Sequence, residues 1–477
     1  MLKRLFAMVP SPIRAAAVYA IGIGWIKGVS LLLLPLLTRL MQPADFGKLE
    51  LLSSAAEVGG LIVGAGLVDT LFRFAAGSGE KGRRAAADVL GLAVAITVAG
   101  LFVLLPLCGV LSRLVPIPTS PLEVSFLIAA ICMEGLIGVP LGWLRMQGRA
   151  FSHVWVTAVR VTVQASLVAA LVLEGHGVTG VLLAGAIVAC SMAAGLAGWQ
   201  TRSSGIGIHP RAWGRLLGYG VPLVAGGLAC FILGSADRWL LAPSVAAAQL
   251  GIYGLACKFA AIAALLTQPF ELWWYPRRMQ VLGGEDGLRR SARTVDALMA
   301  FAMLAAVATS VAAPEMVRLL TPPAYHGAAA LVPWLVLAFC FQQMSSLVSV
   351  GCYTGRTGAQ PMAINLAAAA VAIIGYLAMI PHWGVPGAVA ATVIAQGVRF
   401  ALFAVLSRRR APLPHRVGAL AAVAVMAGAA AAIPWLFHDP AARMAVGAAG
   451  LAAVAAAAFA AGLAGSVWPR RAVWQAA

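Results

Sequence analysis

The sequence predicts an all-α polytopic membrane protein with about 14 transmembrane helices. Only 10% of its 477 residues are charged, 61% are hydrophobic, and the mean hydropathy is +0.92. A soluble globular domain carries about 25% charged residues, so this chain could not cover itself with a solvated surface. Each span needs about 20 apolar residues, and at about 34 residues per helix and loop the length allows roughly fourteen spans. The composition excludes disordered, nucleic-acid-binding and disulfide-rich secreted proteins.

Apolar runs, each long enough to span a bilayer, follow one another along the whole chain. They cover approximately residues 15–38, 49–72, 88–111, 122–144, 151–173, 178–199, 216–241, 249–274, 294–313, 328–350, 361–381, 384–406, 417–437 and 444–467. The connections between them are short, so the sequence predicts neither a soluble domain nor a large outer loop that could hold a catalytic centre.

The basic residues indicate the orientation of these helices. With the N-terminus in the cytoplasm, most of the 34 Lys and Arg residues fall in connections on the cytoplasmic side. The outer connections then hold only Arg39, Lys48, Arg113, Arg318 and Arg443. Cytoplasmic loops of membrane proteins carry such an excess of Lys and Arg. We therefore expect both termini in the cytoplasm, and we interpret most of the formal net charge of +18 as a topology signal.

Three pairs of short glycine motifs recur in the same order in the two halves of the chain. Gly148-Arg149 recurs as Gly355-Arg356, and Gly177-Val178-x-Gly180 recurs as Gly384-Val385-x-Gly387, both 207 residues later. In the third pair, Gly47 precedes Arg73 by 26 residues, and Gly251 precedes Arg277 by the same 26 residues. An internal repeat of this kind is typical of transporters. It predicts two parallel six-helix lobes, residues 1–205 and 206–410, with helices 13 and 14 in residues 411–477.

Five basic residues lie inside the apolar runs or at their ends, namely Lys27, Arg160, Arg238, Lys258 and Arg399. A charged side chain at mid-bilayer costs about 2.5–3.5 kcal/mol and normally faces a partner or water. We predict that these residues line a cavity between the lobes and bind an anionic substrate. The alternative is a structural ion pair or, for Arg238 and Arg399, a side chain that snorkels to the interface.

Acidic residues inside the runs are candidates for coupling to an ion or a proton. Glu57 and Glu134 lie deep in the second and fourth runs, and Asp237 precedes the basic Arg238. The alternative for each is an ion pair with one of the buried cations. Asp69 and Arg73 are four residues apart, a spacing at which helix side chains meet, so we expect them to pair structurally.

The excess of cations over acids within the membrane suits an anionic substrate, such as a lipid whose phosphates enter the cavity while its tails stay in the bilayer. The seven cysteines and seven histidines show no CxxC, no H-E-x-x-H and no cluster at ligand spacing, so no metal and no cofactor are expected.

Several stretches together resemble one known family. They are LLLLPLLTRLMQPADFGKLELL with GAGLVDTLFRF, LLGYGVPLVAGGLACFILGSADRWLLA with QLGIYGLACKFAAIAALLTQPFELWWYPRRM, and IPHWGVPGAVAATVIAQGVRF. In this order they are similar to the polysaccharide-transport flippases, for O-antigen or exopolysaccharide, of the superfamily that includes the multidrug (MATE) and lipid II exporters. The likeness runs over residues 30–410.

The resemblance implies a non-enzymatic flippase in the bacterial inner membrane. Its substrate would be an undecaprenyl-pyrophosphate-linked oligosaccharide, moved to the outer leaflet by alternating access through a cationic cavity and coupled to a proton or sodium gradient. Lys27 and Lys258 match the family's cavity cations best, and Asp237-Arg238 match its helix 7 motif. The implied partners are membrane lipids, a polysaccharide polymerase and a chain-length regulator, and no nucleic acid.

Four other interpretations stay open. A lipid II flippase also has fourteen helices, but the arginine-rich first and second helices expected of it are not seen here. A drug or ion exporter of the same fold is disfavoured for cationic drugs by the cation excess. An O-antigen polymerase or ligase would also present arginines to pyrophosphate, but it generally needs a long outer loop. The last alternative is a purely structural membrane subunit.

Overall fold

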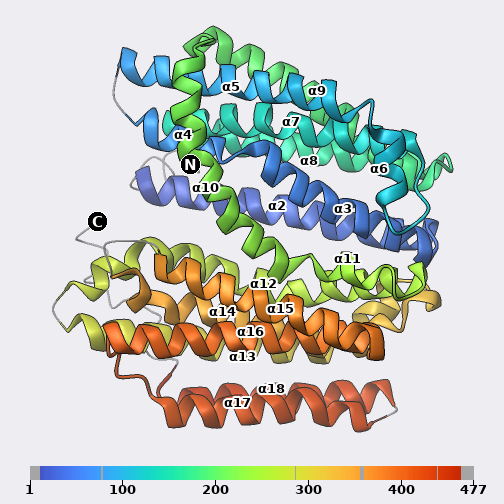
Figure 1. The fold of residues 1–477 in the computed structure, drawn as a ribbon. Helices are drawn as coiled ribbons and strands as arrows, with labels where there is room; N and C mark the ends of the chain where they lie inside the picture. The colour runs from blue at the N-terminus through green and yellow to red at the C-terminus, as the bar shows by residue number, and fades with distance from the viewer. Residues whose placement is uncertain (1–10, 77–78, 285, 355–358, 438, 464–477) are drawn as a thin grey trace, which may run out of the picture. The chain divides into compact units, whose positions relative to one another are not determined.

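The computed structural model describes residues 11–76, 79–284, 286–354, 359–437 and 439–463, and every regular element in these ranges is a helix (Figure 1). Fourteen helical segments among them are long and apolar enough to cross a membrane. The predicted all-α architecture with 14 spans is thereby confirmed.

The α-helices and the three short 3₁₀ helices alternate with brief connections. Their bounds are α2 (Ser11–Leu40), α3 (Pro43–Gly64), α4 (Leu67–Phe74), α5 (Glu80–Leu104), α6 (Cys108–Leu114), α7 (Pro121–Met146), α8 (Ala150–Leu173), α9 (Gly177–Ser204), α10 (Pro210–Gly234), α11 (Asp237–Leu241), α12 (Ala247–Leu282), α13 (Gly287–Leu320), η1 (Pro323–Tyr325), α14 (Ala328–Val348), η2 (Ser349–Tyr353), α15 (Ala359–Trp383), α16 (Val385–Arg410), α17 (Val417–Ala432), η3 (Ile433–Leu436) and α18 (Pro440–Ala460).

The chain divides into two compact units. The first comprises Met1–Phe231 with Ala246–Gly251, and the second comprises Ile232–Val245 with Ile252–Ala477. The lobe boundaries that the repeat suggests, 205 and 410, stay a prediction.

In the second unit α13 is the most buried span, with 72% of its apolar window inside the protein. It packs against α14 on one side and against α17 and α18 on another. Val295, Met299 and Met303 of α13 join a large hydrophobic cluster of the second unit. A helix that is apolar on most of its faces is stable only when it is surrounded in this way.

The repeated glycine motif at the start of α9 and α16 has a positive φ at its first glycine in both copies. Gly177 has φ +49° and Gly384 has φ +56°, a left-handed backbone that glycine adopts at little cost. Three residues later, in both copies, the chain packs closely on what precedes it. A Cβ added at Gly180 would lie 2.9 Å from the Cβ of His176, and one added at Gly387 would lie 2.4 Å from the carbonyl oxygen of Met379. This shared geometry supports the interpretation of the motif as an internal repeat.

A second repeated motif brings two glycines together within the first unit, which includes the first residues of α12. A Cβ on Gly47 would lie 2.2 Å from the carbonyl oxygen of Ala247, and one on Gly251 would lie 2.0 Å from that of Pro43. The first turns of α3 and α12 therefore touch backbone to backbone. The third motif cannot be compared, because Gly355-Arg356 lies outside the described residues.

Each unit also carries a histidine–aspartate pair at the linker that enters α10 or α17. His209 Nδ1 lies 2.7 Å from Asp88 Oδ1, and His415 Nδ1 lies 2.5 Å from Asp296 Oδ1. In the second unit the backbone N–H of Arg416 donates to the other oxygen of Asp296 at 3.0 Å. The two pairs are separated along the chain by almost the repeat shift, so they add a polar contact to the evidence for an internal repeat.

Replacing Asp296 by alanine is expected to lower the free energy of unfolding by about 2 kcal/mol. The carboxylate is 3% exposed, and its loss would leave two donors of the 415–416 linker without their acceptor. The matched Asp88→Ala variant should cost less, because His209 is 72% exposed and can bond to water instead. Thermal unfolding in detergent measures both, and equal shifts in the two variants would contradict this expectation.

The second apolar run, predicted as one helix over 49–72, is broken. Ala65 (φ +44°) and Gly66 (φ +64°) are both left-handed, and they separate α3 from α4. A Cβ on Gly66 would lie 2.5 Å from the carbonyl oxygen of Gly220 in α10, so the break is packed directly against another backbone. The Gly66 carbonyl accepts from both the backbone N–H and the hydroxyl of Thr70, at 3.0 and 2.9 Å, and so begins the hydrogen bonding of α4.

Other helices also differ from their predicted runs, as where the run 88–111 is divided into α5 and α6. The run 216–241 is divided into α10 and α11, and α13 extends past both ends of the run 294–313. Hydropathy marks the part of a helix that lies in the hydrocarbon, whereas arginines such as Arg289 and Arg293 are also good helix formers and continue α13 beyond it.

Candidate functional site

A cavity of about 480 Å³ lies inside the first unit, lined by residues of α3, α7, α8 and α9. Its polar lining consists of Ser53, Glu57, Glu134, Arg160 and Gln164, and the remaining lining residues are small or apolar. The structure thus brings together three predicted candidates that come from three different helices. A pocket with both acidic and basic groups inside a membrane-spanning bundle is a candidate functional site.

The cavity holds an ion pair. Arg160 Nη2 of α8 lies 2.8 Å from Glu134 Oε1 of α7, and the two side chains are 23% and 41% exposed. Both residues therefore form the structural ion pair that is the alternative to substrate binding by Arg160 and to coupling by Glu134. With Glu57 also in the lining, the carboxylates outnumber the guanidinium, so this cavity offers no surplus positive charge to an anion. The substrate-binding role of Arg160 and the coupling roles of the two glutamates stay predictions.

Lys27 lies on α2, the first described span. Its side chain is exposed, and a Cβ added at either flanking glycine, Gly24 or Gly28, would meet no atom within 4 Å. One helix face is therefore open around the ammonium group. The indole of Trp25 donates to the Thr162 hydroxyl at 3.0 Å and ties α2 to α8.

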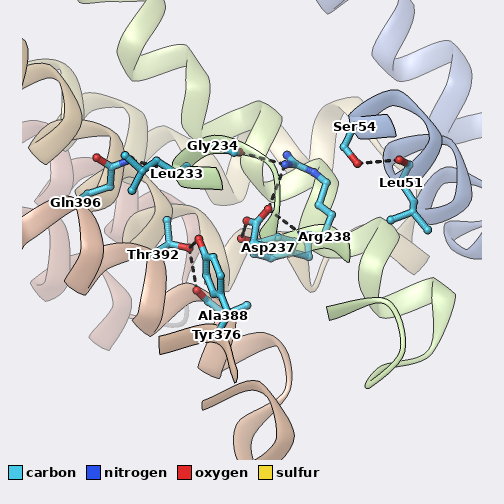
Figure 2. A network of polar contacts seen from close by, with 11 residues as sticks. Leu51, Ser54, Leu233, Gly234, Asp237, Arg238, Tyr376, Ala388, Thr392 and Gln396 are labelled. Atoms are coloured by element: carbon cyan, nitrogen blue, oxygen red, sulfur yellow. Dashed lines mark hydrogen bonds and ion pairs between the residues drawn. The ribbon is translucent and has the colours of Figure 1, made fainter. Parts of the chain in front are cut away.

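The second unit contains a buried polar network (Figure 2). Asp237, in the first turn of α11, accepts from its neighbour's backbone N–H at 2.8 Å and lies 3.4 Å from Nη1 of the Arg238 guanidinium. Its other oxygen accepts from the hydroxyl of Tyr253 on α12. Beside it, the hydroxyls of Tyr376 and Thr392 are 3.0 Å apart. The side chains of Asp237 and Arg238 are only 5% and 12% exposed. Both therefore form the local ion pair that is the alternative to a role in coupling or substrate binding.

The two other predicted cations have different surroundings. Lys258 is exposed, although residues 253–260 of α12 are otherwise buried. Arg399 of α16 donates from Nε to Asn365 Oδ1 of α15 at 2.9 Å, and its guanidinium lies 5.6 Å from the ring of Phe403. The structure therefore does not bring the five predicted cations into one cluster within either unit.

One charged site was not predicted. Glu123 lies 2.7 Å from Nζ of Lys48 on α3 and accepts from the Thr179 hydroxyl of α9 at 3.2 Å. It also forms a capping box with Ser120 at the start of α7. The Ser-x-x-Glu spacing is a known signal for a helix N-terminus and could have identified the cap, but not the two partners from other helices.

The predicted pairing of Asp69 with Arg73 is wrong. No ion pair joins them, although both residues lie in the described part of the chain. The Arg73 guanidinium instead lies 4.9 Å from the ring centre of Tyr219 on α10. An exposed i,i+4 pair is worth only about 0.3–0.5 kcal/mol, so a nearby aromatic ring competes with it easily.

Within the described residues no group of three or more His, Cys, Asp or Glu side chains could hold a metal ion. The arrangement offers instead two separate polar sites, one per unit, each combining carboxylates with an arginine inside a helical bundle.

Comparisons with known proteins agree with this architecture. The sequence model of a family described as "Polysaccharide biosynthesis protein" matches residues 36–330. Among solved structures the chain is similar to "Lipid II flippase MurJ, inward closed conformation", with 11% identity and a TM-score of 0.74, over 93% of this chain and 99% of that one. It is also similar to an inward-facing multidrug resistance MATE family transporter of the MOP superfamily, with 16% identity and a TM-score of 0.58, over 83% and 96%.

A solved structure of the MATE multidrug transporter DinF-BH is similar as well, with 13% identity and a TM-score of 0.58, over 85% of this chain and 96% of that one. No curated protein sequence matches this chain. At such low identities the likeness shows a shared fold, which is the fold that the sequence predicts.

Proposed function

Because this chain belongs to the polysaccharide biosynthesis protein family, we propose that it is a flippase for lipid-linked oligosaccharides. Its substrate is an undecaprenyl-pyrophosphate-linked polysaccharide repeat unit, which it moves across the bacterial inner membrane by alternating access. It carries out no chemical reaction and needs no cofactor. Both termini lie in the cytoplasm, and a polysaccharide polymerase and a chain-length regulator act on the product.

The observation that carries the proposal is the exposure of Lys27 on α2 and of Lys258 on α12, both inside membrane-spanning helices. An ammonium group at such a depth costs about 2.5–3.5 kcal/mol, so a lipid-facing position would be selected against. Facing a hydrated path, the same group binds the phosphates of an anionic lipid headgroup. Arg160, Arg238 and Arg399 are assigned as secondary contacts of the substrate.

Coupling to a proton or sodium gradient is assigned to the acidic candidates Glu57, Glu134 and Asp237. Each lies in or beside a membrane-spanning helix, and two of them share the cavity of the first unit. Their position supports this role, since intramembrane carboxylates commonly form ion or proton relays in transporters.

Neutralising Lys27 and Lys258 together by glutamine is expected to abolish flipping, whereas the charge-conserving Lys27→Arg, Lys258→Arg double variant should keep a large part of it. Transport is measured in proteoliposomes as the accessibility of a lipid-linked oligosaccharide to an added glycosidase. In cells lacking the protein, the same intermediate should accumulate on the inner leaflet. Full transport in the glutamine double variant would overturn the proposal.

The second candidate function is lipid II flipping, which the fold match to a solved lipid II flippase favours. Proteoliposomes loaded with lipid II instead of the oligosaccharide lipid separate the two functions. An O-antigen polymerase would instead produce longer glycan chains from the same substrate, and a drug exporter would change drug susceptibility without affecting either lipid.

A further inference from the structure

One buried carboxyl group has no role in the sites described so far. Glu271 lies on α12, inside the membrane-spanning part Ala247–Tyr275. Its Oε1 atom is inaccessible to solvent and has no hydrogen-bond partner among the described residues. A buried carboxylate oxygen without a partner is rare and calls for an explanation.

The neighbours of Glu271 are neutral. On α12 it shares a helix face with Thr267, one turn earlier. The amide of Gln343 on α14 lies beside the carboxyl group and donates to the Thr267 hydroxyl at 2.6 Å. From α13 the ring of Phe301 packs on that of Phe270, with ring centres 4.6 Å apart. The carboxyl group thus lies beside a neutral amide, which is itself hydrogen-bonded to a neutral hydroxyl.

No described cation lies within ion-pairing distance of this carboxyl group. Arg278, two turns further along the same face of α12, is bound elsewhere. Its guanidinium lies 3.8 Å from the ring centre of Tyr275 and 4.2 Å from that of Tyr353, and it donates to the Ser349 hydroxyl at 3.4 Å. The side chain is only 3% exposed, so two rings and a hydroxyl hold it in place, away from Glu271.

Three further cations on α12 and α16 are bound to other groups or distant. Arg277 donates to the Trp273 carbonyl at 3.0 Å, and Arg399 of α16 donates to Asn365. Lys258 is thirteen positions earlier on α12, or about 20 Å along the helix axis. Glu271 therefore differs from Glu134 and Asp237, each of which contacts an arginine.

An uncompensated carboxylate in a low-dielectric interior is costly, and taking up one proton removes that cost. We propose that Glu271 is a proton-binding site of the second unit, in which the carboxylate binds one proton beside Gln343 and Thr267. On the premise of the proposed flippase function, Glu271 joins the acidic coupling candidates, and the proton bound here is one that coupled transport requires. The site lies near the end of the span Ala247–Tyr275, about two turns before the basic residues at 277–278.

The test of the site does not depend on the transported substrate. Infrared difference spectra of the full-length protein in lipid nanodiscs, recorded during an acid–base titration, should show the carbonyl band of a protonated carboxyl group. Glu271→Gln should remove this band, Glu271→Asp should keep a shifted one, and the control Glu80→Gln, at an exposed ion pair of α5, should leave it unchanged. An unchanged band in Glu271→Gln, in a sample whose thermal unfolding shows that it is folded, would overturn the proposal.

The coupling role is tested in proteoliposomes with an imposed pH gradient. The gradient should accelerate flipping at least tenfold in the wild-type protein but leave the rate unchanged in Glu271→Gln, which should still equilibrate lipid between leaflets. Acceleration by a sodium gradient instead of a proton gradient would overturn the assignment to protons. Absence of lipid flipping in the wild-type protein would contradict the proposed function, while the infrared result would still decide the proton site.

Discussion

Replacing Gly251 by alanine is expected to lower the melting temperature of the protein substantially and to reduce its folded yield. The new Cβ would lie 2.0 Å from the carbonyl oxygen of Pro43 and 2.9 Å from the backbone nitrogen of Gly47. Because these atoms belong to the backbone of α3, they cannot move aside as a flexible side chain can. Overpacking a tight contact costs about 1–3 kcal/mol, and a clash between two backbones falls at the upper end of this range.

The reciprocal variant Gly47→Ala meets the carbonyl oxygen of Ala247 at 2.2 Å and should behave alike. Once the first substitution has separated the two helices, the second finds space, so the double variant should cost less than the sum of the single ones. Gly195→Ala in α9 is the matched control, since its Cβ would meet no atom within 4 Å. Equal melting temperatures for Gly251→Ala and Gly195→Ala would show that the close contact does not exist.

The spans could be predicted from the sequence because their cause is local. Each run of apolar residues must satisfy its backbone hydrogen bonds without water, and in a membrane a helix is the solution that one segment can form alone. The break between α3 and α4 could not be predicted in the same way. Ala65 and Gly66 lie within a continuous apolar stretch, and their left-handed backbone is explained by the approach of Gly220, more than 150 residues away in sequence.

The candidate residues show the same limit. Arg160 and Glu134 could both be identified as intramembrane charges, and their pairing was one of two alternatives, but only the packing of α7 on α8 selects it. Glu271 was missed because it lies near the basic end of its run, where a carboxylate would be expected to pair with Arg277 or Arg278. In the structure these arginines are directed to other partners, which no pattern along the sequence indicates.

Replacing Glu134 by glutamine is expected to reduce transport more than tenfold while changing stability only modestly. The Arg160 guanidinium would lose a carboxylate at 2.8 Å, but both side chains are partly exposed to the cavity, so water replaces part of the interaction. For a pair this exposed, the loss in free energy of unfolding is about 1 kcal/mol. Transport depends on the distribution of charge inside the cavity, which the substitution changes by a full unit.

The swapped variant, with Glu134→Arg and Arg160→Glu together, separates the two effects. It restores an ion pair between α7 and α8, so its melting temperature should return close to that of the wild-type protein. It also moves the positive charge from α8 to α7, and because Glu57 stays in place on α3, the charge pattern of the cavity is not restored. We expect transport to remain low. Recovery of both the melting temperature and transport would show that the pair is purely structural. The control is Arg84→Gln, at an ion pair on α5 that is about three-quarters exposed, and it should leave both the melting temperature and transport unchanged.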